Sequence, residues 1–255
     1  MPATFRKSSA SAPRGYFRWE AAGLVWLAAA DGAPAVGVVE VGEQHLDLVR
    51  LEPGRPTPEH AETLGRGLAR THDAGAAAYG SGPDGWSGAG FLGPLAEPLP
   101  LPLEPVPTWR ALHAEQRLRH TLRLGRDRGV YDAAATRTVE AVAARLERGE
   151  LDDPEPPSRV HGDLWSGNVL WTTTAAVLID PAAHGGHREG DLAMLALFGC
   201  PYLDRVLAAY DEVHPLAAGW QDRVLLHQLH PLMMHAVLFG GGYVAHSLAV
   251  AGHYG

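Results

Sequence analysis

The 255-residue sequence has one cysteine, one lysine and no long apolar run. Its single cysteine, Cys200, excludes an intramolecular disulfide and a cysteine-rich zinc site, and suits a reducing compartment. No stretch approaches the roughly 18 uninterrupted apolar residues of a membrane span. The best candidate, residues 232–250, is interrupted by glycines and histidines, and the first residues lack the apolar segment of a signal peptide. We therefore expect a cytoplasmic protein with no membrane partner.

Positive charge is also scarce, since 21 lysines and arginines stand against 29 acidic residues, for a formal net charge of −8. This excess of negative charge disfavours non-specific binding to nucleic acid or to an anionic membrane. Local cations can still hold phosphate groups on an acidic chain. The apolar content of 46% excludes intrinsic disorder and is sufficient for one large domain or two lobes.

The first fifty residues have the pattern of a small mixed lobe. Apolar residues at helical spacing follow a short β-prone segment, and two further β-prone runs flank a Gly-Glu-Gln turn that predicts a hairpin. A Pro-rich linker comes next. The expected elements are a strand ending at Lys7, a helix over 17–29, and strands over 36–41 and 46–51.

The rest of the chain is mainly helical in pattern. Thr57 and Pro58 begin a capped helix that extends to residue 74, whereas the Gly- and Pro-rich residues after it are expected to be mostly loop. The remaining elements are expected as helices over 109–128 and 132–148, a short hairpin within 160–180, and helices from Asp191 onward. We predict an α+β protein in two lobes, residues 1–52 and 53–255, with a ligand cleft between them.

One motif has a clear chemical meaning. His161, Asp163 and Asn168 form the pattern H-x-D-x-x-x-x-N, and a β-turn-β segment then ends at Asp180. Phosphoryl transfer requires a carboxylate that orients the attacking hydroxyl and accepts its proton, which would be Asp163. It also requires hard oxygen ligands that hold Mg²⁺ against the nucleotide phosphates, which would be Asn168 and Asp180. The pattern predicts a kinase that uses ATP and Mg²⁺.

A polar turn is the structural alternative, since Asn and Asp commonly satisfy backbone groups in loops. The N-terminal part favours the kinase. Lys7 at a strand end and Glu20 in the first helix have the order of the lysine–glutamate pair that positions nucleotide phosphates. An ordinary solvated ion pair would have the same spacing.

Other polar residues near the motif have mainly structural interpretations. Asp191 opens a helix, where an acidic N-cap that holds the catalytic loop is favoured over direct catalysis. His184 and His187 have His-x-x-His spacing but lack the glutamate of a zinc-protease helix, so a metal site there is disfavoured. Trp165, inside the loop, fits either packing or a wall of the acceptor site.

The segment HGDLWSGN, residues 161–168, resembles the signature of the fructosamine (ketosamine) kinase family, a branch of the aminoglycoside phosphotransferase and choline kinase-like fold. Its Trp-Ser-Gly insertion separates this family from general phosphotransferases, whose loop usually lacks it. The resemblance spans nearly the whole chain and continues through residues 91–95, 115–118, 178–182, 187–194, 197–199, 209–210 and 238–243.

This resemblance implies a two-lobed, protein-kinase-like fold and ATP-dependent phosphorylation of the sugar of a ketoamine, usually at its 3-hydroxyl. It also implies a role in deglycation, a small ketoamine or glycated amine as acceptor, and a monomer. The resemblance implies Asp163 as catalytic base, and Asn168 and Asp180 as ligands of Mg²⁺. It implies that Lys7 and Glu20 serve the nucleotide phosphates and that Leu48, Val49 and Leu51 lie beside the adenine. His161, Trp165 and Asp191 would support the loop or the acceptor site.

The sequence departs from the family near Lys7, because in the family two further strands and a phosphate-covering loop precede the lysine. Two explanations stay open: either the true start lies upstream, or the small lobe lacks these parts, which would weaken nucleotide binding. Two alternatives to a ketosamine kinase follow: a kinase of another hydroxylated amine, such as an aminoglycoside or a choline-like compound, and a non-catalytic pseudokinase. The intact Asp163, Asn168 and Asp180 argue against the pseudokinase.

Overall fold

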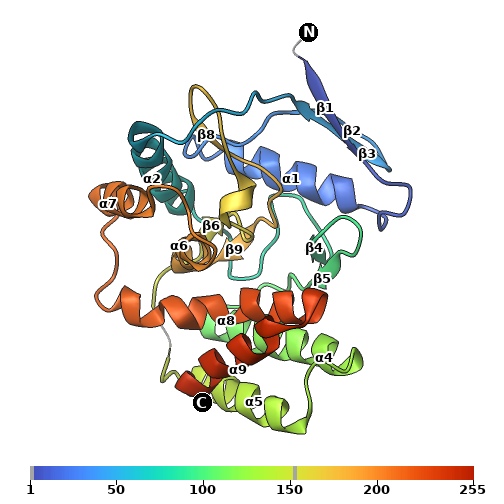
Figure 1. The fold of residues 1–255 in the computed structure, drawn as a ribbon, viewed down its shortest axis with the longest axis vertical. Helices are drawn as coiled ribbons and strands as arrows, with labels where there is room; N and C mark the ends of the chain where they lie inside the picture. Colours follow the sequence, from blue (N-terminus) through green and yellow to red (C-terminus); the bar gives the residue numbers. More distant parts are fainter. Residues whose placement is uncertain (1–2, 152–153) are drawn as a thin grey trace.

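The computed structural model describes residues 3–151 and 154–255, with a small sheet at one end of the molecule and packed helices at the other (Figure 1). The strands are β1 (Thr4–Ser8), β2 (Val38–Val41), β3 (His45–Val49), β4 (Gly90–Leu92), β5 (Leu99–Leu101), β6 (Ser158–Val160), β7 (Val169–Trp171), β8 (Ala176–Leu178) and β9 (His184–Gly186). The α-helices are α1 (Tyr16–Ala28), α2 (Pro58–Asp73), α3 (Trp109–Ala111), α4 (His120–Asp127), α5 (Ala133–Glu147), α6 (Arg188–Leu197), α7 (Leu203–Val213), α8 (Trp220–Phe239) and α9 (Gly242–Tyr254). A π-helical segment, η1 (Leu112–Arg119), and a 3₁₀ turn, η2 (Ser166–Asn168), complete the set.

The N-terminal sheet is antiparallel, with the strand order β1-β3-β2, and confirms the predicted hairpin. Its inner face is apolar: Leu46 and Leu48 of β3 are buried in a cluster with Phe17 and Leu24 of α1. Burial of this face fixes the position of α1 against the sheet, which aligns the side chain of Lys7 on β1 with α1.

Helix α2 confirms the predicted capped helix. The Thr57 hydroxyl accepts a hydrogen bond from the amide of His60, and Pro58 occupies the first turn, where its missing N–H costs nothing. The apolar face of α2, which includes Leu64 and Leu68, packs on α7 in a second core cluster. As a result, the last turn of α2 lies beside the first turn of α6.

The chain also forms two short antiparallel pairs, β6-β9 and β7-β8. Strands β6 and β9 lie between the N-terminal sheet and the helical end, whereas β8 lies at the level of that sheet (Figure 1). The β7-β8 pair confirms the predicted β-turn-β segment. Isolated bridges join this segment to earlier parts of the chain, from Ala35 to Leu178 and from Pro53 to Thr172. The hairpin therefore ties the N-terminal sheet to the loop that carries the motif.

The helical end has a core of its own, in which η1, α4, α5, α8 and α9 pack around apolar side chains such as Leu118, Val139 and Leu229. In the part of the chain that the structure describes, no helix has the length and apolar character needed to cross a membrane.

Three details differ from the sequence-based expectations. The Gly- and Pro-rich segment contains the β4-β5 hairpin, so the chain after α2 holds three two-stranded sheets and not one hairpin. The helix expected over 109–128 is continuous, but η1 within it is π-helical, a change that apolar periodicity does not reveal. The helix expected from Asp191 begins at Arg188. A division into two lobes at residue 52 stays a prediction.

Candidate active site

The motif loop between β6 and β7 is shaped by a glycine. Gly162 has a φ of 80°, and a Cβ at this position would lie 2.2 Å from the carbonyl oxygen of Ala182. Both the backbone conformation and the close approach therefore require glycine. The preceding residue, His161, is buried, and its Nε2 lies 2.9 Å from the carbonyl oxygen of Ile179. These contacts hold the loop against the segment that carries Asp180.

Asp163 and Asn168 are in direct contact. The Nδ2 of Asn168 donates to the backbone oxygen of Asp163 at 2.8 Å and to its Oδ2 at 3.1 Å, which leaves the amide oxygen of Asn168 available as a ligand atom. Burial raises the pKa of Asp163 to about 7. The hydrogen bond from Asn168 opposes this effect, and the charges of Asp180 and Asp191 reinforce it. A carboxyl group poised near neutrality is suited to accept a proton.

Lys7 joins two acidic residues from distant parts of the chain. Its Nζ donates to Oε2 of Glu20 at 2.8 Å and to Oδ1 of Asp180 at 3.1 Å. Burial on its own lowers the pKa of Lys7, but the charges of the two carboxylates outweigh burial and raise it, so the ammonium stays charged. Asp180 has a φ of 52°, a conformation that non-glycine residues adopt mainly where the surroundings enforce it. The predicted Lys7–Glu20 pair is present, and Asp180 meets it at the same point.

Asp191 holds the motif loop, but not as a helix N-cap. The N-cap of α6 is His187, whose Nδ1 accepts a hydrogen bond from the Glu189 amide, and Asp191 lies within the first turn. The predicted N-cap is wrong because the helix begins almost one turn earlier than its pattern indicates. The Asp191 carboxylate instead accepts hydrogen bonds from the amides of His161, at 2.7 Å, and Gly162, at 3.0 Å.

A buried network that the motif did not reveal supports Asp191. The Nε2 of His72, on α2, lies 3.1 Å from Oδ2 of Asp191, and its Nδ1 lies 2.8 Å from the Tyr210 hydroxyl. Arg188 donates to that hydroxyl at 3.2 Å. Burial alone would raise the pKa of Asp191, but the hydrogen bond and charge of His72 lower it below its ordinary value, so the carboxylate is ionised. His72 and Asp191 lie 119 residues apart, a separation that leaves no local pattern in the sequence.

Asp163, Asn168, Asp180 and Lys7 line a cavity of about 400 Å³. The acidic side chains on its wall are Glu20, Asp163, Asp180 and Asp191. A second group of lining side chains, from η1, β9 and α8 with neighbouring segments, is aromatic and basic, and includes Trp109, His113, Arg117, His184, His227 and His230.

The other predicted residues divide into two groups. Trp165 lines the cavity, is 39% exposed and contacts Phe198, so it is positioned as a wall of the cavity more than as a core residue. Leu48, Val49 and Leu51 are not among the described residues that line the cavity. Leu48 is buried in the cluster beneath the sheet, and Leu51 packs against that cluster. A role for these three residues beside the adenine stays a prediction.

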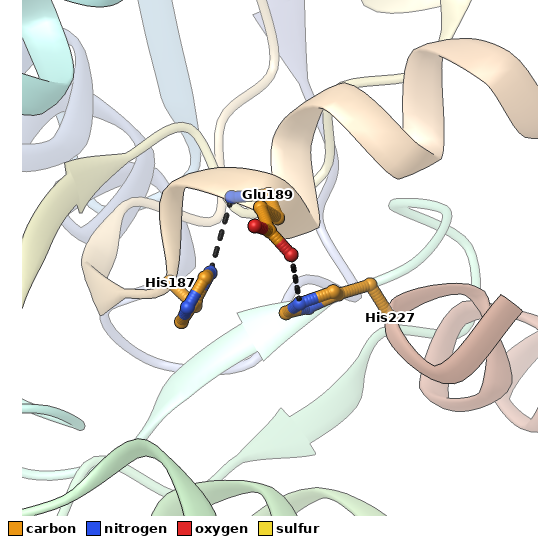
Figure 2. Close-up of side chains that lie close together, drawn as sticks. All are labelled: His187, Glu189 and His227. Atoms are coloured by element: carbon orange, nitrogen blue, oxygen red, sulfur yellow. Dashed lines mark hydrogen bonds and ion pairs between the residues drawn. The ribbon is translucent and has the colours of Figure 1, made fainter. Parts of the chain in front are cut away.

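Figure 2 shows a separate group of possible metal ligands, formed by His187 and Glu189 at the start of α6 and by His227 on α8. Glu189 already forms a two-point ion pair with Arg223, at 2.9 and 2.5 Å, and its Oε2 lies 3.2 Å from Nε2 of His227. A cation would have to displace the guanidinium from this carboxylate. The contacts therefore favour a structural network over a metal site.

The oxygen atoms of Asn168 and Asp180 fit the ligand chemistry of Mg²⁺, which prefers hard oxygen donors and retains several waters. The Asp180 side chain is 44% exposed, which leaves room for water and phosphate oxygens at such an ion. A carboxyl group with a pKa near neutrality, a half-buried ammonium group and hard oxygen ligands line one cavity, and phosphoryl transfer to a hydroxyl requires groups of these kinds.

Comparison with known proteins identifies the family. A model of the fructosamine kinase family matches residues 2–251. The chain is 35% identical over 233 residues to the "Probable ketoamine kinase slr1563" of Synechocystis sp., a match that covers 89% of this chain and 74% of the relative. It is 34% identical over 241 residues to the "Probable ketoamine kinase TTHA1179" of Thermus thermophilus, with 93% of this chain and 82% of the relative covered.

Solved structures confirm the fold. A candidate fructosamine-3-kinase from Thermobifida fusca YX-ER1 is 48% identical, with a TM-score of 0.88 over 97% of this chain and 84% of that chain. The structure of APH(2")-IIa with gentamicin is 10% identical, with a TM-score of 0.61 over 97% of this chain and 84% of that chain, and this likeness shows the fold alone. The predicted protein-kinase-like α+β fold is therefore confirmed. Since the family model matches nearly the whole chain and both relatives exceed 30% identity, the chain belongs to the fructosamine kinase family, whose members are phosphotransferases that act on a hydroxyl group.

Proposed function

We propose that this protein is an ATP- and Mg²⁺-dependent kinase that phosphorylates a sugar hydroxyl of ketoamines, the adducts of sugars with amines. The observation that carries the proposal is the convergence on one cavity of Lys7, from the start of the chain, with Asp163 and Asp180 of the motif segment. Membership of the fructosamine kinase family supports a ketoamine as the acceptor.

Asp163 acts as the catalytic base in this proposal. It orients the acceptor hydroxyl and takes its proton as the oxygen attacks the γ-phosphorus. The new O–P bond forms, the bond from the γ-phosphorus to the bridging oxygen breaks, and ADP leaves. A pKa of about 7 keeps the carboxylate available as a base at neutral pH, and the hydrogen bond from Asn168 fixes its orientation.

Lys7 contacts the nucleotide phosphates, and Glu20 keeps the ammonium in place through their 2.8 Å hydrogen bond. Asn168 and Asp180 would hold Mg²⁺, which neutralises negative charge on the phosphates when it is bound. The strand and hinge residues Leu48, Val49 and Leu51 are the proposed neighbours of the adenine, and Trp165 would form a wall of the acceptor site. We further propose that the phosphorylated ketoamine breaks down, so that the reaction deglycates the amine.

The test is ADP release from ATP and Mg²⁺ with fructose-lysine or ribulose-lysine as acceptor. We expect acceptor-dependent turnover that falls by about 10²- to 10⁴-fold in the Asp163→Asn variant, because a positioned base contributes on that order. The matched control is Asp127→Asn, at an exposed aspartate of α4, which should retain wild-type turnover. Turnover with an aminoglycoside or choline but not with either ketoamine would contradict the proposed substrate, and ADP release that Asp163→Asn leaves unchanged would contradict the proposed base.

A further inference from the structure

The cavity contains a buried arginine that pairs with no carboxylate among the residues that the structure describes. Arg117, on η1, is 4% exposed, and its Nη1 donates only to the backbone oxygens of Pro102, at 3.1 Å, and Gln116, at 3.3 Å. Its Nη2 is buried and has no hydrogen-bond partner among the residues that the structure describes. Arg188, which is equally buried, differs in this respect because its Nη1 lies 3.0 Å from Oδ1 of Asp73.

An unpaired guanidinium in this position is energetically unfavourable, because desolvation of the charge is not offset by a counter-ion. Burial lowers the pKa of Arg117 to about 9, and no other group moves it appreciably, so the side chain is still protonated at neutral pH. The acidic residues on the cavity wall are engaged elsewhere: Asp180 contacts Lys7, and Asp191 contacts the motif loop and His72. A charge of the opposite sign is therefore missing beside Arg117.

The neighbours of Arg117 are neutral hydrogen-bonding groups. His113 precedes it by four residues on the same helix, is 5% exposed, and has no partner for its Nε2 among the described residues. Trp109 stacks on His113 with ring centroids 4.9 Å apart. Burial, and to a lesser degree the charge of Arg117, lowers the pKa of His184 to about 3 and that of His230 below its ordinary value. Both His113 and His184 already donate an N–H to a backbone carbonyl oxygen, of Leu226 and of Ala182 respectively. As neutral rings they add no repulsion to the buried charge, but they offer no further N–H to an anion.

The backbone that carries His113 and Arg117 is itself unusual, since the eight residues of η1 are π-helical. π-helical turns are rare and occur frequently at functional sites. His113 and Arg117 each have a buried nitrogen atom without a partner among the described residues, and both line the cavity. This position is consistent with a functional role for the π-helical segment.

This group of residues shares the cavity with the motif loop. His184 lies beside the loop, since a Cβ on Gly162 would be 2.8 Å from its Nδ1, and it also lies within the electrostatic influence of Arg117. Asp163 and Arg117 both line the cavity of about 400 Å³. An elongated acceptor with a hydroxyl at Asp163 can thus extend toward Arg117.

We propose that Arg117 forms a carboxylate-binding subsite, with His113 as a neutral neighbour, and that the acceptor is the ketoamine of a small aminocarboxylic acid such as a free amino acid. A guanidinium matches a carboxylate in shape and charge, and the carboxylate would supply both a partner for Nη2 and the missing counter-ion. This inference rests on the proposed kinase function, because it assigns the anionic part of the same substrate.

The test compares ketoamines that differ only in this charge. Fructose adducts of glycine, 4-aminobutyrate and 6-aminohexanoate are compared with the adducts of the corresponding amides, as acceptors for ATP-dependent phosphorylation. The three acids vary the distance from sugar to carboxylate. We expect kcat/KM for the best acid to exceed that of its amide by about 10- to 100-fold, as is typical of a hydrogen bond to a charged group. Equal kcat/KM for every acid and its amide would overturn the subsite.

The Arg117→Gln variant tests whether Arg117 causes the preference for the acid over its amide. We expect it to lose the preference for the acid over the amide, whereas Arg123→Gln, on the exposed side of the neighbouring helix, keeps that preference. Turnover of the amides shows that the variant is folded. If Arg117→Gln does not fold, Arg117→Lys, which keeps the charge, replaces it and should retain part of the preference. A variant that keeps the full preference without a charge at position 117 overturns the assignment. Absence of turnover in the wild type with all six ketoamines and also with fructose-lysine and ribulose-lysine would instead refute the kinase proposal on which the inference rests.

Discussion

Asp163 connects the chemistry of the site to a measurable pH dependence. Burial raises its pKa to about 7, and the carboxyl must be ionised to accept a proton from the acceptor hydroxyl. We therefore expect kcat/KM to rise with pH up to about 7 and then to level off, with a decline of about tenfold per pH unit below that value. Initial rates between pH 5 and 9 test this, with the melting temperature at each pH as a control for unfolding. A flat profile from pH 5 to 7 would contradict the assignment of Asp163 as the base.

Gly162 is a residue for which the structure predicts both a loss of stability and a loss of activity. A Cβ there would meet the Ala182 carbonyl oxygen at 2.2 Å, in addition to the strain of a φ of 80°. Gly199 is a matched control, because its φ is 75° but no heavy atom lies within 4 Å of an added Cβ. We expect Gly199→Ala to lower the free energy of unfolding by about 1 to 2 kcal/mol and Gly162→Ala to lower it further, since only the second adds a clash to the strain. Urea denaturation and kcat measure the two effects. Equal stability of the two variants would show that the loop accommodates the methyl group.

At the scale of elements, the motif loop is positioned by helices that are distant in the sequence. Asp191 of α6 binds two loop amides, and His72 of α2 holds Asp191. Removal of the imidazole leaves the buried Asp191 carboxylate without its side-chain partner, although the two loop amides remain. We expect His72→Ala to lower the free energy of unfolding by about 1 to 3 kcal/mol. We also expect kcat to fall while KM for ATP changes little, because the loop would shift and the nucleotide contacts would not.

The Tyr210→Phe variant is a comparison for His72→Ala. Tyr210→Phe removes only the hydroxyl that lies 2.8 Å from His72 Nδ1, so it should produce a smaller change of the same kind. A His72→Ala enzyme with unchanged kcat would mean that Asp191 holds the loop without help from α2.

The elements that could be predicted from the sequence have local signals. The Thr57 cap marks the start of α2, and the motif residues Asp163, Asn168 and Asp180 lie close enough in the chain to be recognised as one group. The π-helical hydrogen bonding of η1 has no signature in apolar spacing, so it could not be predicted. The importance of Arg117 could not be predicted either, because it follows from a missing partner, and a missing partner is a property of the folded chain.

At the scale of the whole molecule, the proposed nucleotide site joins the N-terminal sheet and α1 to the motif loop through Lys7, Glu20 and Asp180. A ligand that binds here stabilises the folded chain as a unit, and at 100 times its dissociation constant it should add about 2.7 kcal/mol to the free energy of unfolding. We expect ATP with Mg²⁺ to raise the melting temperature, and EDTA or Asp180→Asn to remove most of this increase. Asp127→Asn should leave it intact. The same increase with EDTA as with Mg²⁺ would contradict a metal role for Asn168 and Asp180.

We propose that the groups of this cavity transfer the γ-phosphate of ATP to a sugar hydroxyl of a ketoamine. The most direct measurement is mass and ³¹P NMR analysis of the product formed from ATP, Mg²⁺ and fructose-lysine by the wild type and by Asp163→Asn. We predict a ketoamine monophosphate with the phosphate on the sugar, at its 3-hydroxyl, from the wild type and almost none from the variant. ADP and inorganic phosphate without any phosphorylated ketoamine would contradict the claim.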